Sequence, residues 1–474
     1  MITLDHVTYA YPFQAVPAVM DISLAVSPGE AVLITGASGC GKSTIIRLIN
    51  GLSPHYFKGL LEGRVIINGR DTTGMRIQDI CRTVGTLFQD PEQQFFAMTV
   101  EDEIAFVHEW RESSTVAVQE AVQRAASDFG LKPLLKRPLH GLSEGQKQKV
   151  ALASIMSLGP GALALDEPTA NLDPEATRRL AELIRSLKRQ GLAIVIVDHR
   201  LYWLEDTVDR VLVMDRGRIA TEGNFSILSE ASNREAYGLR KERVTDTRQQ
   251  LQEYAGLNSH LEVRDLRFAY RNGPELYDGV TFTCAQGVTG FLGANGTGKT
   301  TLARLLTGLS PMRSGRLLIK GEKTTPAKLL KNAGIVLQNA DHQLLMKTVR
   351  DELMLSTGNF KGAARDSLVA ETLQYFRLDH LAERHPQSLS GGEKQRLVIA
   401  CGIIRKPEIL ILDEPTSGLD GKNMQLISAA IRKAADEGTG VFLISHDLEL
   451  IESTCDFALR FPLQNNGRKG EQYV

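Results

Sequence analysis

The chain has 474 residues, a length that predicts roughly two to four domains, each large enough to bury its own core. Its composition, 42% hydrophobic and 23% charged, is that of a globular protein and excludes disorder over most of the length. The 55 Lys and Arg residues nearly balance the 56 Asp and Glu residues, and the net charge is −1. We therefore expect no nucleic-acid partner, because the surface as a whole lacks the positive charge that nucleic-acid binding needs.

Cysteine usage and hydropathy indicate a protein of the reducing cytosol. The first residues, MITLDHVTYAYP, lack the basic and apolar segments of a signal peptide. Apolar runs such as GLAIVIV (191–197) and EILIL (408–412) have the length of buried strands and are too short to cross a membrane. We expect membrane contact only through partner proteins. Neither disulfides nor a zinc site are predicted, because the five cysteines are scattered and form no CxxC pair: Cys40, Cys81, Cys284, Cys401 and Cys455.

In chain order, the first half alternates predicted strands with predicted helices. Strands near 31–35, 84–87, 162–166 and 193–198 are separated by helical stretches such as 175–189. Strands joined by crossover helices run parallel in one sheet. The sequence therefore predicts an α/β fold built on a mixed or mostly parallel sheet.

The second half repeats the first. This predicts one duplicated domain, because three motifs recur in the same order: GASGCGKST (36–44) as GANGTGKTT (293–301), LSEGQKQK (142–149) as LSGGEKQR (389–396), and LALDEPTANLD (163–173) as LILDEPTSGLD (410–420). The last two pairs are both 247 residues apart. We expect the first domain over 1–228, a polar linker over 229–258 and the second domain over 259–474.

The first of these motifs is offset further, by 257 residues, so the first copy carries extra residues after it. Part of the excess lies in SPHYFKGLLEGR (53–64), which has 12 residues where SPMRSGR (310–316) has seven. We expect this insert to be a loop.

Both Gly-rich segments fit the pattern GxxxxGK[ST] and follow an apolar strand. Glycines let backbone N–H groups wrap phosphates at a helix N-terminus, the lysine pairs with the β- and γ-phosphates, and the hydroxyl of Ser43 or Thr300 ligates Mg²⁺. Two matches make a chance Gly-rich turn a negligible alternative. The candidate nucleotide-binding residues are Gly36, Ser38, Gly39, Gly41, Lys42, Ser43 and Thr44 in the first copy, and Gly293, Asn295, Gly296, Gly298, Lys299, Thr300 and Thr301 in the second.

Two predicted strands end in an acid pair. A carboxylate at the end of a buried strand is costly without a partner, and Mg²⁺ is the natural partner. Asp166 and Asp413 are therefore candidate metal ligands, directly or through water. Glu167 and Glu414 are candidates to polarise an attacking water. The alternative is that the acids cap a helix beside the proline that follows each pair.

A histidine follows an apolar run in each copy, in IVIVDHR and VFLISHD. A lone histidine at a strand end is usually structural. His199 and His446, however, both lie 33 residues after the first acid of the pair, which favours contact with a γ-phosphate.

This set of motifs resembles the ATP-binding cassette (ABC) ATPases over nearly the whole chain outside the linker. The decisive addition is LSEGQ (142–146) and LSGGE (389–393), whose serines each precede the aspartate of the acid pair by 23 residues. In that family this signature opens a helix whose N-terminus caps the γ-phosphate of ATP held by the other domain. The resemblance implies two P-loop ABC nucleotide-binding domains, each with a helical subdomain, in a head-to-tail pseudo-dimer that sandwiches two ATP with Mg²⁺.

The resemblance also assigns further roles. Gln89 and Gln338 become the glutamines that reach Mg²⁺ and the attacking water. Tyr11 and Tyr270 become the adenine-stacking aromatics, although Tyr9 competes with Tyr11 and each could equally be a core tyrosine. Site one would use Lys42, Ser43, Gln89, Asp166, Glu167 and His199, closed by Ser390, Gly392 and Glu393; site two would use Lys299, Thr300, Gln338, Asp413, Glu414 and His446, closed by Ser143, Gly145 and Gln146.

The two copies depart from the family pattern in different ways. Glu144 takes a signature position that is usually Gly, which would bring a second carboxylate toward the γ-phosphate in site two. At ~5 Å and an effective dielectric near 20, the repulsion would reach roughly 3 kcal/mol before screening, so we expect site two to turn over more slowly. Cys40 stands in the first P-loop where the second has Thr297. A small side chain that simply fits is the favoured interpretation, over a thiol sensitive to oxidation.

The segment FQDPEQQFF (88–96) resembles the Q-(N/D)-P-(D/E)-x-Q loop of energy-coupling factor (ECF) transporter ATPases, and the second copy LQNADHQLL (337–345) lacks the proline. The resemblance implies an ATP-hydrolysing subunit on the cytoplasmic face of the cell membrane, peripheral, under an integral membrane transport component and a separate membrane substrate-binding component. The cargo would be a vitamin, a vitamin precursor or a metal ion. We interpret Phe95 and Phe96 as apolar floor for a helix of the membrane partner.

Other ABC ATPases remain as alternatives. Tandem ATPases of monosaccharide importers have a similar length, but one of their sites usually lacks a catalytic acid, and here both acid pairs and both histidines are intact. Ribosomal ABC ATPases normally carry a longer charged arm between the domains. Other non-transport mechanoenzymes, such as DNA-repair ABC ATPases, carry long insertions that this sequence does not show.

Overall fold

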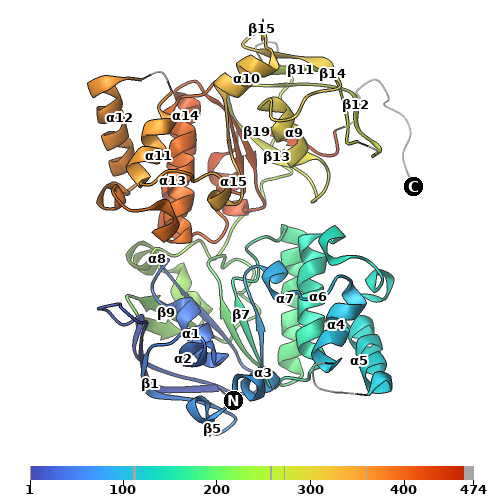
Figure 1. Ribbon diagram of the computed structural model, residues 1–474, viewed down its shortest axis with the longest axis vertical. Helices are drawn as coiled ribbons and strands as arrows, with labels where there is room; N and C mark the ends of the chain where they lie inside the picture. Colours follow the sequence, from blue (N-terminus) through green and yellow to red (C-terminus); the bar gives the residue numbers. More distant parts are fainter. Residues whose placement is uncertain (1, 110–113, 257–258, 272, 359, 464–474) are drawn as a thin grey trace. The chain divides into compact units, whose positions relative to one another are not determined.

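The computed structural model describes residues 2–109, 114–256, 259–271, 273–358 and 360–463 (Figure 1). The chain divides into two compact units, Met1–Arg243 with Asp420–Lys422, and Val244–Leu419 with Asn423–Val474. The expected linker over 229–258 contains helix α8 (Ala231–Tyr237) and the boundary between the units, while its residues 257–258 lie outside the described part. The limits 1–228 and 259–474 stay predictions.

The first unit contains a small antiparallel sheet and a larger, mostly parallel sheet. The antiparallel sheet has the order β2-β1-β4-β5, with β1 (Ile2–Ala10), β2 (Val19–Val26), β4 (Leu60–Ile67) and β5 (Arg70–Asp71). The larger sheet has the order β10-β9-β3-β8-β7-β6, with β3 (Ala31–Gly36), β6 (Val84–Leu87), β7 (Ala162–Asp166), β8 (Ala193–Val197), β9 (Arg210–Asp215) and β10 (Arg218–Gly223). Its strands run parallel except at the β9–β10 edge.

The helices of the first unit cover the two faces of the larger sheet or pack on one another beside it. They are α1 (Lys42–Ile49), α2 (Leu52–His55), α3 (Ile77–Thr83), α4 (Val100–Glu109), α5 (Thr115–Asp128), α6 (Glu144–Ser157), α7 (Pro174–Arg189) and α8. Helices α4, α5 and α6 pack on one another around their own apolar core, away from β1 and β5 (Figure 1). They form the helical subdomain that the resemblance implies.

The local sequence explains where helix α7 begins and which of its side chains are buried. Asp173 accepts the backbone N–H of Ala176 at 2.6 Å, and Pro174 occupies the first turn, where a missing N–H costs nothing. Leu180, Ile184 and their periodic neighbours are buried against the parallel sheet.

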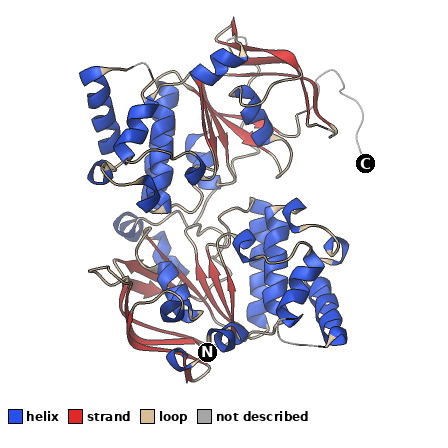
Figure 2. Cartoon of the chain, in the orientation of Figure 1, coloured by secondary structure: helices blue, strands red, loops and turns tan. Residues whose placement is uncertain are grey.

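The second unit repeats this arrangement (Figure 2). Its antiparallel sheet has the order β12-β11-β14-β15, with β11 (Leu261–Ala269), β12 (Glu275–Cys284), β14 (Ser314–Ile319) and β15 (Glu322–Lys323). Its parallel sheet has the order β16-β17-β18-β13-β19, with β13 (Gly287–Leu292), β16 (Ala333–Val336), β17 (Ile409–Asp413), β18 (Gly440–Ile444) and β19 (Phe457–Arg460). The helices are α9 (Lys299–Leu306), α10 (Pro326–Asn332), α11 (Val349–Ser356), α12 (Gly362–Tyr375), α13 (Gly391–Ile404), α14 (Gly421–Asp436) and α15 (Leu448–Thr454).

The predicted α/β fold, its parallel sheet and its duplication are confirmed, and the four predicted strands and the helix 175–189 match β3, β6, β7, β8 and α7. The insert at 53–64 is not the loop we expected. Its second part is strand, because Leu60, Leu61 and Glu62 continue the antiparallel ladder opposite β1. The extra residues therefore lengthen β4 beyond its counterpart β14.

Candidate active sites

The carboxyl ends of neighbouring parallel strands bring the predicted motifs together in each unit. In the first unit, β3 leads into the P-loop, β7 ends at Asp166, and β8 is followed by His199. The registers Ile34 with Val197 and Asp166 with Val197 place these ends side by side. This is the edge at which open α/β sheets bind ligands.

Each P-loop is built to receive an anion at the start of a helix. The ammonium of Lys42 donates to the carbonyl oxygens of Gly36 and Ala37, at 3.0 and 2.8 Å, and so lies folded into the loop. Helix α1 begins after Gly41 without a side-chain cap, so the first N–H groups of the helix remain available to phosphate oxygens. Gly41 has φ 106°, and a Cβ there would lie 2.5 Å from the carbonyl oxygen of Ala18, which only glycine avoids.

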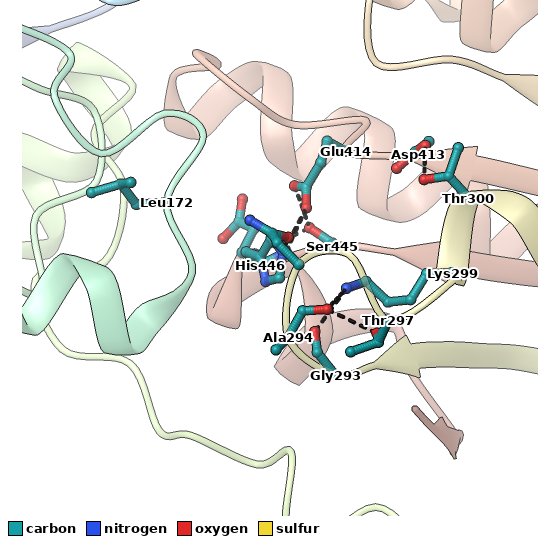
Figure 3. A network of polar contacts seen from close by, with 12 residues as sticks. Leu172, Gly293, Ala294, Thr297, Lys299, Thr300, Asp413, Glu414, Ser445 and His446 are labelled. Atoms are coloured by element: carbon teal, nitrogen blue, oxygen red, sulfur yellow. Dashed lines mark hydrogen bonds and ion pairs between the residues drawn. The ribbon is translucent and has the colours of Figure 1, made fainter. Parts of the chain in front are cut away.

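The second P-loop has the same geometry (Figure 3). The Lys299 ammonium donates to the carbonyl oxygens of Gly293 and Ala294, at 2.7 and 2.8 Å, and α9 begins after Gly298 without a side-chain cap. Thr297, which stands where the first copy has Cys40, donates to the Ala294 carbonyl at 2.8 Å. Burial raises the pKa of the Cys40 thiol, which agrees with a small side chain that fits rather than a reactive thiolate.

A hydroxyl and a carboxylate meet beside each P-loop, in the donor set that Mg²⁺ prefers. Ser43 Oγ lies 3.3 Å from Asp166 Oδ1, and Thr300 Oγ1 lies 3.1 Å from Asp413 Oδ2. Burial raises the pKa of both aspartates. A divalent cation would repay the cost of keeping these carboxylates charged, so the residues fit the predicted metal.

Glu167 is the meeting point of the first site. It follows β7 in the left-handed region, with φ 48°, and its N–H donates to Val197 at 2.7 Å, which fixes this uncommon conformation. Gln89 donates to its carboxylate at 2.9 Å, and His199 Nε2 lies 3.6 Å from its other oxygen. The structure thus brings together three residues that the sequence predicted separately.

Burial dominates the electrostatics of Glu167 and His199 in the first site. Burial, with smaller contributions from Asp166 and Asp198, raises the pKa of Glu167 to about 8. Burial, together with Lys42 and Arg240, lowers the pKa of His199 well below its ordinary value. A buried carboxyl group with a raised pKa beside a histidine is a candidate for proton transfer.

The second site holds its glutamate differently (Figure 3). Glu414 also has φ 48°, but it accepts the backbone N–H of His446 at 2.9 Å and the hydroxyl of Ser445 at 3.2 Å. His446 Nε2 lies 2.8 Å from Asn295 Oδ1 of the P-loop and 3.9 Å from Glu414. Ser445 thus donates a hydrogen bond to the Glu414 carboxylate. At the matching position the first unit has Asp198, whose negative charge raises the pKa of Glu167. Gln338 follows β16, as Gln89 follows β6.

The tyrosines separate into core and site. Tyr9 is fully buried and donates to the carbonyl oxygen of Phe57, whereas the hydroxyl of Tyr11 lies 3.3 Å from Thr44 Oγ1. Tyr270 is half exposed, and its hydroxyl lies 2.7 Å from Thr301 Oγ1. Tyr11 therefore corresponds to Tyr270 in position; that both stack on adenine stays a prediction.

Each signature motif opens a helix with a reciprocal cap. Ser143 Oγ accepts the N–H of Gln146 at 3.4 Å while the Gln146 side chain accepts the Ser143 N–H at 3.0 Å. Ser390 and Glu393 form the same box on α13. The Gln or Glu at this position is thus engaged in the cap. Gly145 lies against Ala176, and Gly392 lies against Leu419, where an added Cβ would be 3.2 or 3.3 Å from the nearest side-chain atom.

We call the segments 88–96 and 337–345, which contain Gln89 and Gln338, the glutamine loops. Other residues of these segments fix the loop backbone through hydrogen bonds, a role that the sequence did not reveal. Asp90 caps the 3₁₀ helix η2 (Pro91–Gln94) through the N–H of Glu92. Gln94 accepts the Phe88 N–H at 3.2 Å and donates to the Thr86 carbonyl at 3.2 Å. In the second unit, Asn339 caps η6 (Ala340–His342), and Gln343 makes the matching bonds to Leu337 and Ile335.

The two phenylalanines face different environments, which corrects our interpretation of both as surface. Phe95 is half-buried and packs against two apolar clusters of the first unit, whereas Phe96 is 76% exposed. Leu344 and Leu345 divide in the same way, at 6% and 77% exposure. Alternating directions are expected of an extended segment, so only the second member of each pair belongs to the surface.

Each signature helix also carries a lysine with a largely covered side chain, which the sequence analysis missed. Lys147 Nζ lies 2.7 Å from Glu144 and also forms an ion pair with Glu92 of η2. Lys394 lies 2.7 Å from Asp341 of η6. The Lys147 charge offsets that of Glu144, which reduces the repulsion that we expected Glu144 to impose on a γ-phosphate.

The comparisons with known proteins agree with this geometry. A family model described as ABC transporter matches residues 19–170 and 277–417, more than half of the chain. The chain belongs to the ABC transporter family. A proposed ABC transporter ATP-binding protein of Treponema denticola is 37% identical over 494 residues, covering 100% of this chain and 99% of the relative. This ABC transporter ATPase is therefore an ATP-hydrolysing enzyme with two nucleotide-binding domains.

Two further similarities are informative in different ways. A proposed HMP/thiamine import ATP-binding protein, YkoD of Bacillus subtilis, is 33% identical, covering 97% of this chain and 89% of the relative. The archaeal ribosome recycling factor aABCE1, solved with ribosomal stalk protein aP1, has a TM-score of 0.63 at 21% identity, covering 96% and 87% of the two chains. At that identity the likeness shows the fold alone. Within the described ranges, no helix of this ABC ATPase is long and apolar enough to cross a membrane.

Proposed function

We propose that this ABC ATPase is the energising subunit of an ECF-type importer of a vitamin, vitamin precursor or metal ion. The observation that carries the proposal is the glutamine loop, which connects the catalytic carboxylate to an exposed apolar surface. Gln89 donates to Glu167 at one end of the loop, and Phe96 projects into solvent at the other. The similarity to a relative named for HMP/thiamine import supports the vitamin class of cargo.

The exposed surface of the first unit has the composition of a docking site. Phe96, Met98 and Phe106 are 76%, 72% and 36% exposed, and the rings of Phe96 and Phe106 stack at 5.3 Å. Glu103 accepts the N–H groups of Phe96 and Ala97 at 2.9 Å, which anchors the patch to α4. Apolar side chains held out by a fixed backbone favour a helix of an integral membrane component as the partner.

The second unit offers a different surface at the same place. Leu345 and Leu355, which occupy the positions of Phe96 and Phe106, are 77% and 64% exposed. Aliphatic side chains replace the stacked rings, so the two units would grip different helices of the membrane partner. Contact with the membrane is then made through partner proteins at its cytoplasmic face, with a separate membrane component capturing the substrate.

Each residue has a defined task in the proposed reaction. Lys42 and Lys299, with the N–H groups that start α1 and α9, would hold the phosphates of ATP. Ser43 with Asp166, and Thr300 with Asp413, would hold Mg²⁺, which neutralises phosphate charge when bound. Glu167 and Glu414 would orient the attacking water, supported by the glutamines and histidines, and the signature helix of the other unit would complete each site.

Purification of the tagged full-length chain from detergent-solubilised membranes tests the proposed function. We expect integral membrane proteins to copurify, and ATPase activity of the complex to be lost when Glu167→Gln and Glu414→Gln are combined. Recovery of ribosomes or DNA, with no integral membrane protein, would overturn the proposal.

A further inference from the structure

One lysine in each unit joins the glutamine loop to the signature helix. Lys147 lies in the first turn of α6 and reaches Glu92 of η2, 55 residues earlier. Lys394 lies in the first turn of α13 and reaches Asp341 of η6, 53 residues earlier, with a second bond of 3.1 Å to Gln387. The two contacts therefore join corresponding elements: α6 to η2 in the first unit, and α13 to η6 in the second.

The lysines are placed where a helix alone would not favour them. A positive charge in the first turn opposes the helix dipole, and a buried ammonium costs free energy unless it is paired. The side chain of Lys147 is only 9% exposed, and that of Lys394 is 15% exposed. Their partners in η2 and η6 therefore offset the cost of burying both lysines, and separating η6 from α13 would take from Lys394 its acidic partner Asp341.

We propose that Lys147 and Lys394 are positioning residues that make the N-terminus of each signature helix move with the glutamine loop of the same unit. The proposal rests on the proposed roles of the glutamine loop and the signature. A displacement of η6 by a docked partner would shift Asp341, and the ion pair would carry the shift to the first turn of α13. The glutamine loop itself is stiff, because Gln343 bonds the backbone at Leu337 and Ile335.

The two units differ in how the connection is made. Lys147 is shared between Glu92 and Glu144, so in the first unit the lysine also holds the first residue of the signature helix. The second unit has Gly391 where the first has Glu144, so α13 offers Lys394 no acid at the matching position. The second unit is therefore the cleaner place for a test.

A double-mutant cycle on the purified full-length chain tests the proposal. Lys394→Met, Asp341→Asn and their combination each lower kcat by about tenfold, because misplacing a catalytic helix has effects of this order. The double variant should lose no more kcat than either single variant, because the first substitution already breaks the ion pair. ATP affinity, measured with a fluorescent ATP analogue, stays within about twofold, because neither residue touches the P-loop.

The control cycle uses Arg350 and Glu383, an ion pair of the same helical subdomain at 2.8 Å that does not involve η6. Arg350→Met and Glu383→Gln should leave kcat unchanged. The proposal is overturned if the Lys394 and Asp341 variants keep wild-type kcat, if their effects multiply, or if the melting temperature falls in the same pattern while kcat does not. If Lys394→Met does not fold, Asp341→Asn alone decides, since it preserves side-chain size. Failure of the importer proposal would appear separately, as an absence of integral membrane proteins in the purification.

Discussion

The side chain of Gln89 donates a hydrogen bond of 2.9 Å to the carboxylate of Glu167, across 78 residues of sequence. The amide stands at the end of β6, where a rigid 3₁₀ turn begins, and the carboxylate stands at the end of β7. Since β6 and β7 are parallel neighbours, a movement of the loop changes the surroundings of the Glu167 carboxylate directly.

Replacing Gln89 with Ala should lower kcat by about tenfold or more while leaving ATP affinity nearly unchanged, because the amide supports Glu167 rather than the phosphate-binding loop. Steady-state ATPase assays and a fluorescent ATP analogue measure the two quantities. Gln93→Ala is the matched control, because the exposed Gln93 side chain bonds its neighbour Asp90 at 3.2 Å. Equal losses in the two variants would contradict the role of Gln89.

The two active sites should differ in rate. We expect Glu167→Gln to remove more ATPase activity than Glu414→Gln, because in the proposed head-to-tail pairing Glu144 would face the nucleotide of site two. The ion pair between Glu144 and Lys147 limits this effect, so Glu144→Gly should raise turnover by no more than about threefold. Single-turnover assays with each variant provide the comparison. If both glutamine variants lose activity equally, the predicted asymmetry is wrong.

Phe95 and Phe96 should respond differently to the same substitution. Phe95→Ser removes a half-buried ring from two apolar clusters and should destabilise the first unit by about 1–3 kcal/mol. Phe96→Ser should leave stability and basal ATPase activity unchanged but abolish recovery with membranes. Chemical denaturation and membrane sedimentation measure the two effects, and Leu344→Ser and Leu345→Ser provide the matching pair. If Phe96→Ser unfolds the protein, Phe96 is a core residue and its assignment to a docking surface is wrong.

The second unit should lose stability in mild acid through His260. Burial lowers the pKa of His260 below its ordinary value of 6.5, and its Nε2 lies 2.8 Å from the Glu408 carbonyl oxygen. As pH falls below 6.5, the unfolded chain takes up the proton before the folded one, so stability decreases. In the His260→Gln variant, the melting temperature should therefore depend less on pH between about pH 7.5 and pH 5. The control is His380→Gln: His380 is exposed, so its replacement should leave the pH dependence of the melting temperature unchanged.

The motifs at the strand ends could be predicted because parallel strands share one carboxyl edge, which forces the P-loop, Asp166, Glu167 and His199 together. The ion pair between Lys147 and Glu92 could not, because charged residues far apart in sequence give no signal of how a helix packs on a turn. The insert after α1 was misjudged as a loop because its pairing with β1 depends on register, which polar and Gly-containing sequence specifies weakly.

A photo-crosslinking amino acid at position 96, activated in native membranes, tests the central claim that the glutamine loop couples ATP hydrolysis to a membrane partner. Position 60 is the control, since Leu60 is 77% exposed but lies on the antiparallel sheet. The account predicts a crosslink from position 96 to an integral membrane protein, and none from position 60. Crosslinks from position 96 only to ribosomal or other soluble proteins would contradict it.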